Sequence, residues 1–116
     1  MTEIDRQRER AAKNQSHFRD VNERIEELSH RNGFAANGSA FIEFVCECAL
    51  DGCIEYVSLT REEYEDIRRE PNRFFVLPGH ALEGVEDVVD SDARYIVVAK
   101  LGVGAKVAGN LDPRQG

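Results

Sequence analysis

The stretch Cys46-Glu47-Cys48-Ala49-Leu50-Asp51-Gly52-Cys53 contains all three cysteines of this 116-residue chain. It lies between two segments, residues 41–48 and 54–59, in which apolar residues alternate with polar ones. That alternation is typical of half-buried antiparallel strands. Asp51-Gly52 is a turn signal between them. The stretch therefore predicts a β-hairpin, with Glu43 and Glu47 on its outer face.

The same hairpin gathers the thiols. Successive side chains of a strand point to opposite faces, so Cys46 and Cys48 project to one side, and the turn returns Cys53 to them. Three sulfurs and one imidazole make a tetrahedral zinc site, and the tight Pro-Gly turn before His80 makes this histidine the expected fourth ligand. Asp51 or a water molecule is the alternative fourth ligand. The predicted metal ligands are therefore Cys46, Cys48, Cys53 and His80.

Two other interpretations of the cysteines stay open. The spacing Cys-x-Cys-x₄-Cys is not one of the common zinc-ribbon spacings. Free cysteines are often simply small buried apolar residues, and clustered thiols also serve as redox groups. Buried structural thiols and redox-active thiols are thus the alternatives to zinc.

Composition places the chain among ordinary globular proteins. Hydrophobic residues make up 41% and charged residues 32% of the sequence, as in a typical folded domain. No apolar run approaches the roughly 20 residues that span a bilayer, and the charged start of the chain lacks the apolar core of a signal peptide. We therefore expect a cytoplasmic protein without membrane association, in which thiols stay reduced and clustered cysteines favour metal binding.

The net charge of −7 argues against broad attraction to nucleic acid. Residues 1–31 are neutral overall, so the acidic excess lies in the rest of the chain. Nucleic-acid binding normally shows a basic stripe, and acidic neighbours dilute the one basic cluster. That cluster consists of Arg6, Arg8, Arg10 and Lys13.

Residues 2–31 contain no Pro or Gly and predict one long helix that ends at Asn32-Gly33. Its second half has an apolar stripe, formed by Phe18, Val21, Ile25 and Leu28, that should pack on the domain. The first half has a thinner stripe and is expected either to project, fray or meet a partner helix, or to belong to an ordinary docked helix with a frayed start, which is the favoured interpretation. The predicted partner-binding residues there are Ile4, Arg8 and Ala11.

The rest of the chain predicts further short elements. Thr60-Arg61-Glu62-Glu63 matches a capping box, which begins a helix that Pro71 ends. Residues 73–77 and 95–101 resemble strands, while the pattern around residues 85–89 fits a helix or a strand equally. The expected organisation is an N-terminal helix (1–33), a small α+β zinc-type domain (34–101) and a flexible tail (102–116).

The chain resembles a group of small uncharacterised bacterial proteins. The residues that carry the resemblance are Phe18-Arg19-Asp20-Val21-Asn22-Glu23-Arg24-Ile25, Cys46-Glu47-Cys48, Glu63-Tyr64-Glu65 and Pro78-Gly79-His80. It covers most of the chain and implies a cytoplasmic bacterial origin, but it names no activity.

The sequence thus predicts an α+β fold, in which a long N-terminal helix packs on a small antiparallel sheet with one inserted helix. The protein is expected to be a small zinc-stabilised, non-enzymatic module with a regulatory role. It would bind a protein partner or form a homodimer through the N-terminal helix. The alternatives are a nucleic-acid-associated transcriptional regulator and a thiol-based redox sensor.

Overall fold

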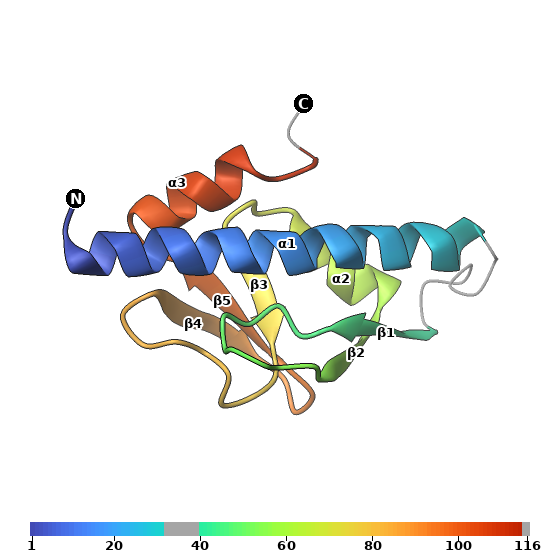
Figure 1. Cartoon of the computed structure of the whole chain (residues 1–116). Helices are drawn as coiled ribbons and strands as arrows, with labels where there is room; N and C mark the ends of the chain where they lie inside the picture. The colour runs from blue at the N-terminus through green and yellow to red at the C-terminus, as the bar shows by residue number, and fades with distance from the viewer. Residues whose placement is uncertain (32–39, 115–116) are drawn as a thin grey trace.

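The computed structural model describes residues 1–31 and 40–114 and confirms the predicted α+β architecture. A long helix lies across one side of the molecule, with the strands and a short second helix behind it (Figure 1). In chain order the elements are α1 (Glu3–Arg31), β1 (Phe41–Val45), β2 (Tyr56–Thr60), α2 (Arg61–Arg68), β3 (Arg73–Val76), β4 (Glu86–Ser91), β5 (Ile96–Lys100) and α3 (Val103–Asn110). The predicted stop of α1 at Asn32-Gly33 lies outside the described residues.

The strands form two antiparallel sheets. β1 and β2 are a hairpin with Phe41 opposite Thr60 and Val45 opposite Tyr56, as the sequence predicted, although β1 ends three residues earlier than expected. The second sheet has the order β3-β5-β4. β4 covers the region whose pattern was ambiguous, and an irregularity in its pairing lies between Val88 and Asp90.

Three aromatic rings form the centre of the core. Phe44 and Tyr64 stack with centroids 4.5 Å apart, and Phe75 meets both rings edge-on. Tyr64 is placed there by α2, whose start has the predicted capping box: the Thr60 hydroxyl accepts from the Glu63 amide, and the Glu63 carboxylate accepts from the Thr60 amide. The hairpin, α2 and the second sheet therefore share one core.

α1 packs through small and polar residues, which the sequence analysis did not predict. Its buried residues are Ala11, Ala12, Gln15, Ser16, Arg19 and Asn22. In the expected stripe, Val21 and Leu28 are exposed, Phe18 is half-buried and Ile25 packs against the apolar core. Polar residues take the buried face, where Gln15, Arg19 and Asn22 find hydrogen-bond partners inside the protein. The prediction that the stripe docks α1 is therefore confirmed for Ile25 and wrong for Val21 and Leu28.

The first half of α1 does not project. Ala11 and Ala12 are buried, and the Arg8 Nε donates to the Gly84 carbonyl at 2.9 Å. α3 packs against α1 so closely that a Cβ on Gly104 would lie 3.1 Å from the Arg8 carbonyl oxygen. Two further predictions are thereby corrected: residues 103–110 are a docked helix and not a flexible tail, and Ala11 is buried in its own fold.

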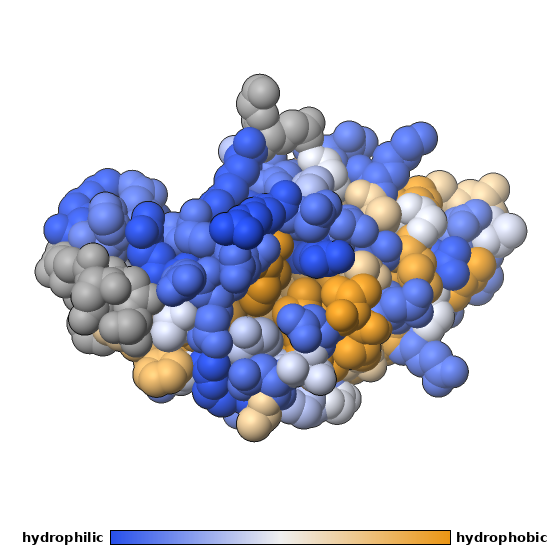
Figure 2. Space-filling view, turned by 180° about the vertical axis from the view of Figure 1, so that it is seen from behind, coloured by the Kyte–Doolittle hydropathy of each residue, from blue (hydrophilic) through white to orange (hydrophobic). Residues whose placement is uncertain are grey.

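One apolar cluster spans the three predicted parts of the chain, since it includes Phe44 and Ala108 with Ile25 packed against it. The division at residues 33/34 and 101/102 therefore does not mark separate units. Seen from behind, apolar residues gather in the middle and toward the end of the molecule where α1 begins (Figure 2). None of the helices in residues 1–31 and 40–114 has the length and apolar character of a membrane span.

Candidate metal centre

The structure brings the four predicted ligands together. The ligand atoms of Cys46, Cys48, Cys53 and His80 all lie within 4.8 Å of one another. The His80 Nδ1 is 3.7 Å from the Cys46 Sγ and 3.6 Å from the Cys53 Sγ. All three cysteines are free thiols. This group can hold a metal ion.

Two tight turns of the same construction present two of the ligands. The His80 amide donates to the Leu77 carbonyl at 2.9 Å, with Pro78 and Gly79 between them and Gly79 at φ +86°. A positive-φ Gly in third place is what a type II turn requires, and Pro is common in second place. The Cys53 amide likewise donates to the Leu50 carbonyl at 3.3 Å, with Gly52 at φ +77°. In both turns the fourth residue is the ligand.

The backbone also directs donors at the sulfurs. The Leu77 amide donates to the Cys46 Sγ at 3.3 Å, and the Leu50 amide donates to the Cys48 Sγ. Burial raises the pKa of both thiols; Cys48 and Cys53 add to the shift of Cys46, and Cys53 adds to the shift of Cys48, which the Cys46 thiol opposes. A bound cation reverses that effect, because it stabilises the thiolate. Amides that already point at the sulfurs therefore fit a metal-bound thiolate state.

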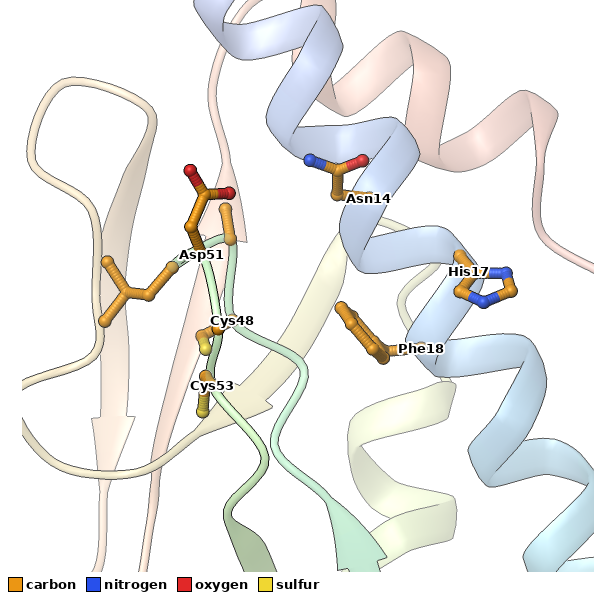
Figure 3. Close-up of a pocket in the computed structure, with 9 residues that line it drawn as sticks. Asn14, His17, Phe18, Cys48, Asp51 and Cys53 are labelled. Atoms are coloured by element: carbon orange, nitrogen blue, oxygen red, sulfur yellow. The ribbon is translucent and has the colours of Figure 1, made fainter.

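The centre lies where the turn of the hairpin meets the 77–80 turn, a partly solvent-exposed region that we call the metal corner. Cys46 and Cys48 are buried, whereas Cys53 and His80 are half-buried. A cavity of about 290 Å³ borders Cys48 and Cys53. The Phe18 ring of α1 lines the same cavity and points across it toward the cysteine turn (Figure 3). Asp51, the alternative fourth ligand, is exposed, and its carboxylate points away from the sulfurs in Figure 3.

Glu47, between two of the ligands, was predicted on the outer face of the hairpin but is fully buried. β1 ends at Val45, so the alternation of the strand no longer applies to it. Its carboxylate accepts from the Asn22 side chain at 2.8 Å and from the Phe75 amide at 3.3 Å. Burial raises the pKa of Glu47 to about 7 against the opposing effect of these two donors. Glu47 thus fixes the ligand loop to α1 and β3.

A second group of buried polar side chains, Gln15, Glu86 and Lys100, lies beside Glu47. Lys100 and Glu86 form an ion pair of 3.0 Å between side chains that are both 0% exposed. The Gln15 side chain donates to the Glu86 carboxylate at 3.0 Å and to the Glu47 carbonyl at 2.9 Å, and its own oxygen accepts from Lys100. Burial lowers the pKa of Lys100, while Glu86 opposes the shift. The group connects α1, the three-stranded sheet and the ligand loop.

Comparisons with protein-family models, with curated proteins and with solved structures gave no match. The Cys-x-Cys…His pattern of the predicted resemblance is present as a spatial cluster in the fold. Membership of the group of bacterial proteins stays a prediction.

Proposed function

We propose that this protein is a small zinc-stabilised, non-enzymatic module that binds a protein partner. The observation that carries the zinc assignment is the Cys46, Cys48, Cys53 and His80 cluster. A tetrahedron with Zn–S of about 2.3 Å and Zn–N of about 2.05 Å has an S···N edge of about 3.6 Å. Two of the three S···N distances, 3.6 and 3.7 Å, match that edge, and the Cys48 sulfur lies within 4.8 Å of the His80 ligand atom.

The donor set supports a structural site. Three thiolates and an imidazole are soft or borderline ligands that suit zinc better than magnesium or calcium. Four protein ligands complete a tetrahedron, whereas catalytic zinc keeps one position for water or substrate. The cluster would join the hairpin to the 77–80 turn, so that the energy of zinc binding becomes folding energy.

Exposed apolar side chains on the hairpin support the choice of a protein partner. Ile54 is 85%, Tyr56 61% and Phe41 55% exposed. Phe41 and Tyr56 belong to the outer face, since Ile42 and Val57 beside them are buried. Ile54 and Tyr56 are two residues apart, whereas Phe41 lies at the other end of the ladder, opposite Thr60, with the Arg94 guanidinium over its ring. The exposed apolar side chains of Ile54 and Tyr56 are therefore the candidate contact point for a protein partner. We therefore place the partner on this face and not on the first half of α1. Of the three residues predicted there, Arg8 and Ala11 make contacts within the chain and Ile4 is exposed.

The edges of the hairpin favour binding through its face. On β1, Asn22 bonds both the amide and the carbonyl of Val45 at 2.9 Å. On β2, the Arg94 guanidinium donates to the Ser58 carbonyl at 2.6 Å. Side chains of the same chain thus occupy backbone groups that an added strand would need.

A nucleic-acid partner has less support. In the basic cluster of α1, Arg6 pairs with Glu3 and Lys13 with Glu9. Each pairing neutralises a charge that would otherwise contact phosphate.

Metal analysis tests the zinc assignment. Protein purified under reducing conditions without added metal should contain about one zinc per chain. His80→Ala should lower zinc retention in a chelator titration, whereas His30→Ala, at an exposed position of α1, should not. Folded, reduced protein with well under half an equivalent of zinc would contradict the proposal.

Site-specific crosslinking tests the partner. A photo-reactive amino acid at Ile54 should form a protein adduct in cells, and the same group at exposed Glu70 should not. Adducts of doubled chain mass would identify the partner as a second copy. Zinc-loaded protein without any adduct at position 54 would remove this binding face while leaving the metal site in place.

A further inference from the structure

The four predicted ligands are unequally accessible. Cys46 and Cys48 are buried, and Cys53 is half-buried. Cys53 also borders two hollows. One is the 290 Å³ cavity next to Phe18, and the other lies on the opposite side, beside Ile54 and His80. A small solute therefore reaches the Cys53 sulfur before the other two.

One particular thiol lies next to Cys53. The last ladder pair is Val45 with Tyr56, and the Cys46 amide makes one more bond of this kind by donating to the Glu55 carbonyl at 3.0 Å. Beyond Cys46 the ladder ends, and the turn from Leu50 to Cys53 brings Cys53 back to Cys48. The two sulfurs interact and lie side by side at the cavity (Figure 3).

This proximity suits a disulfide. The two sulfurs lie within 4.8 Å of each other in one short loop, and an S–S bond is about 2.05 Å long. Cys46 is placed differently: its amide donates to the Glu55 carbonyl, and its sulfur accepts from the Leu77 amide. Cys48 is thus the thiol best placed to pair with Cys53.

We propose that the metal centre is also a redox switch, in which a hydroperoxide converts Cys48 and Cys53 into a disulfide and the metal is released. This rests on the proposed zinc site. The Cys53 thiolate attacks the peroxide; an S–O bond forms, the O–O bond breaks, and the leaving hydroxide or alkoxide takes up a proton. The Cys48 thiolate then attacks the sulfenic sulfur; the S–S bond forms, the S–O bond breaks, and hydroxide leaves as water after protonation. The two thiolates lose two electrons, which the peroxide gains.

Release follows from the loss of ligands. A disulfide removes two of the three thiolates and leaves Cys46 and His80, too few to hold a closed site. The 77–80 turn then loses its metal link to the hairpin, while the new disulfide keeps the turn between Cys48 and Cys53 closed. The exposed Ile54, which follows Cys53 directly, belongs to the segment that changes. Oxidation and partner binding would thereby affect the same corner.

The experiment uses the full zinc-loaded chain and hydrogen peroxide. Free zinc is followed with a chromogenic indicator, and the intact mass and the disulfide-linked peptides are measured in parallel. We expect one zinc released for each chain that loses about 2 Da, a bond between Cys48 and Cys53, and recovery of zinc binding after reduction. Zinc retained while the thiols oxidise, or a bond that includes Cys46, would overturn the proposal.

Two variants provide a matched control that does not depend on zinc binding. Cys46→Ser keeps the proposed pair and should still lose about 2 Da, whereas Cys48→Ser should instead gain oxygen on Cys53. Equal loss of about 2 Da in both variants would also overturn the assignment, and the wild-type peptide map decides if either variant misfolds. Protein that contains no zinc before oxidation would contradict the proposed function instead, so the two failures are distinguishable.

Discussion

The proposed metal centre and the buried polar contacts beneath α1 both hold the ligand loop, by different means. The four side chains of the metal centre gain a common bond only when an ion is present. The polar contacts lie inside the molecule, and their hydrogen bonds form within the chain alone. We call the second group the polar seam; it consists of Gln15, Arg19, Asn22, Glu47, Glu86 and Lys100. The comparison predicts that the corner responds to metal and oxidant and that the seam does not.

Arg19 shows how the seam works. Its guanidinium donates to the Pro71 carbonyl at 2.6 Å and to the Ala108 carbonyl at 2.8 Å, and it lies 4.6 Å over the Phe74 ring. Ala108 is in the last turn of α3, where carbonyl groups lack partners within the helix and cations are favourable. One buried cation therefore ties α1 to α3 and to the loop before β3. Such a contact fixes geometry but tolerates little change.

The largest expected effect is the loss of one partner in the seam. Lys100→Met should lower the free energy of unfolding by about 3–5 kcal/mol, because it leaves the Glu86 carboxylate buried without its cation. Urea unfolding at neutral pH measures this. Lys106→Met, at an exposed position of α3, should change the stability by less than about 0.5 kcal/mol. Similar losses in both variants would contradict the view that the seam stabilises the fold independently of surface charge.

Removing the metal should have the next largest effect. With free zinc at about 100 times its dissociation constant, chelation should lower the free energy of unfolding by about 2.7 kcal/mol. The seam and the aromatic core remain, so we expect a destabilised and not an unfolded chain, checked by circular dichroism and thermal melts. Chelation should have little effect on His80→Ala if that variant no longer retains zinc. Complete unfolding of the chelated wild type would show that the seam cannot hold the fold without the corner.

The sequence predicted that Cys46, Cys48, Cys53 and His80 come together, because the chemistry of these residue types is specific. Few residue types bind a soft metal, all three cysteines fall within eight positions, and Gly52 and Gly79 mark turns that local backbone rules recognise. The strand alternation of Ile42 and Phe44 was sufficient to predict the hairpin. Burial of the sulfurs and the approach of His80 across the fold then followed from the same residues.

The seam could not be predicted in this way. Gln15, Arg19 and Asn22 on a helix normally face water, and only the tertiary partners of each reverse that preference. The visible apolar stripe of Phe18, Val21 and Leu28 indicated the wrong face, since periodicity counts apolar residues and cannot count satisfied polar ones. Glu47 was misplaced because alternation was extended past the end of β1. Residues 103–110 have a Gly-rich sequence that suggested a tail, but Gly104 is what allows α3 to approach α1.

The smallest expected effect concerns two carboxyl groups at the outer end of the interface between α1 and α2. Glu26 and Glu65 share a hydrogen bond; burial and the Glu65 carboxylate raise the pKa of Glu26 to about 8. Burial alone would raise the pKa of Glu65, but its hydrogen bonds with Arg114 outweigh this effect and lower the pKa to about 2. Arg61, Arg114 and Glu23 also face this pair.

The sign of the pH dependence follows from proton counting. The usual glutamate pKa is 4.5, so between pH 4.5 and 8 the folded pair holds a proton that the unfolded chain has released. The free energy of unfolding therefore falls as the pH rises through this window. Glu26→Gln removes the titrating group and should reduce that fall, by about 0.5 kcal/mol for a pair this close to solvent. Urea unfolding at pH 5, 6, 7 and 8 measures the slope, part of which should remain because Glu47 titrates in the same window.

Glu27→Gln, an exposed neighbour on α1, should leave the slope as in the wild type. An equal slope in wild type and Glu26→Gln would mean that the two carboxyl groups do not share a proton in the folded chain.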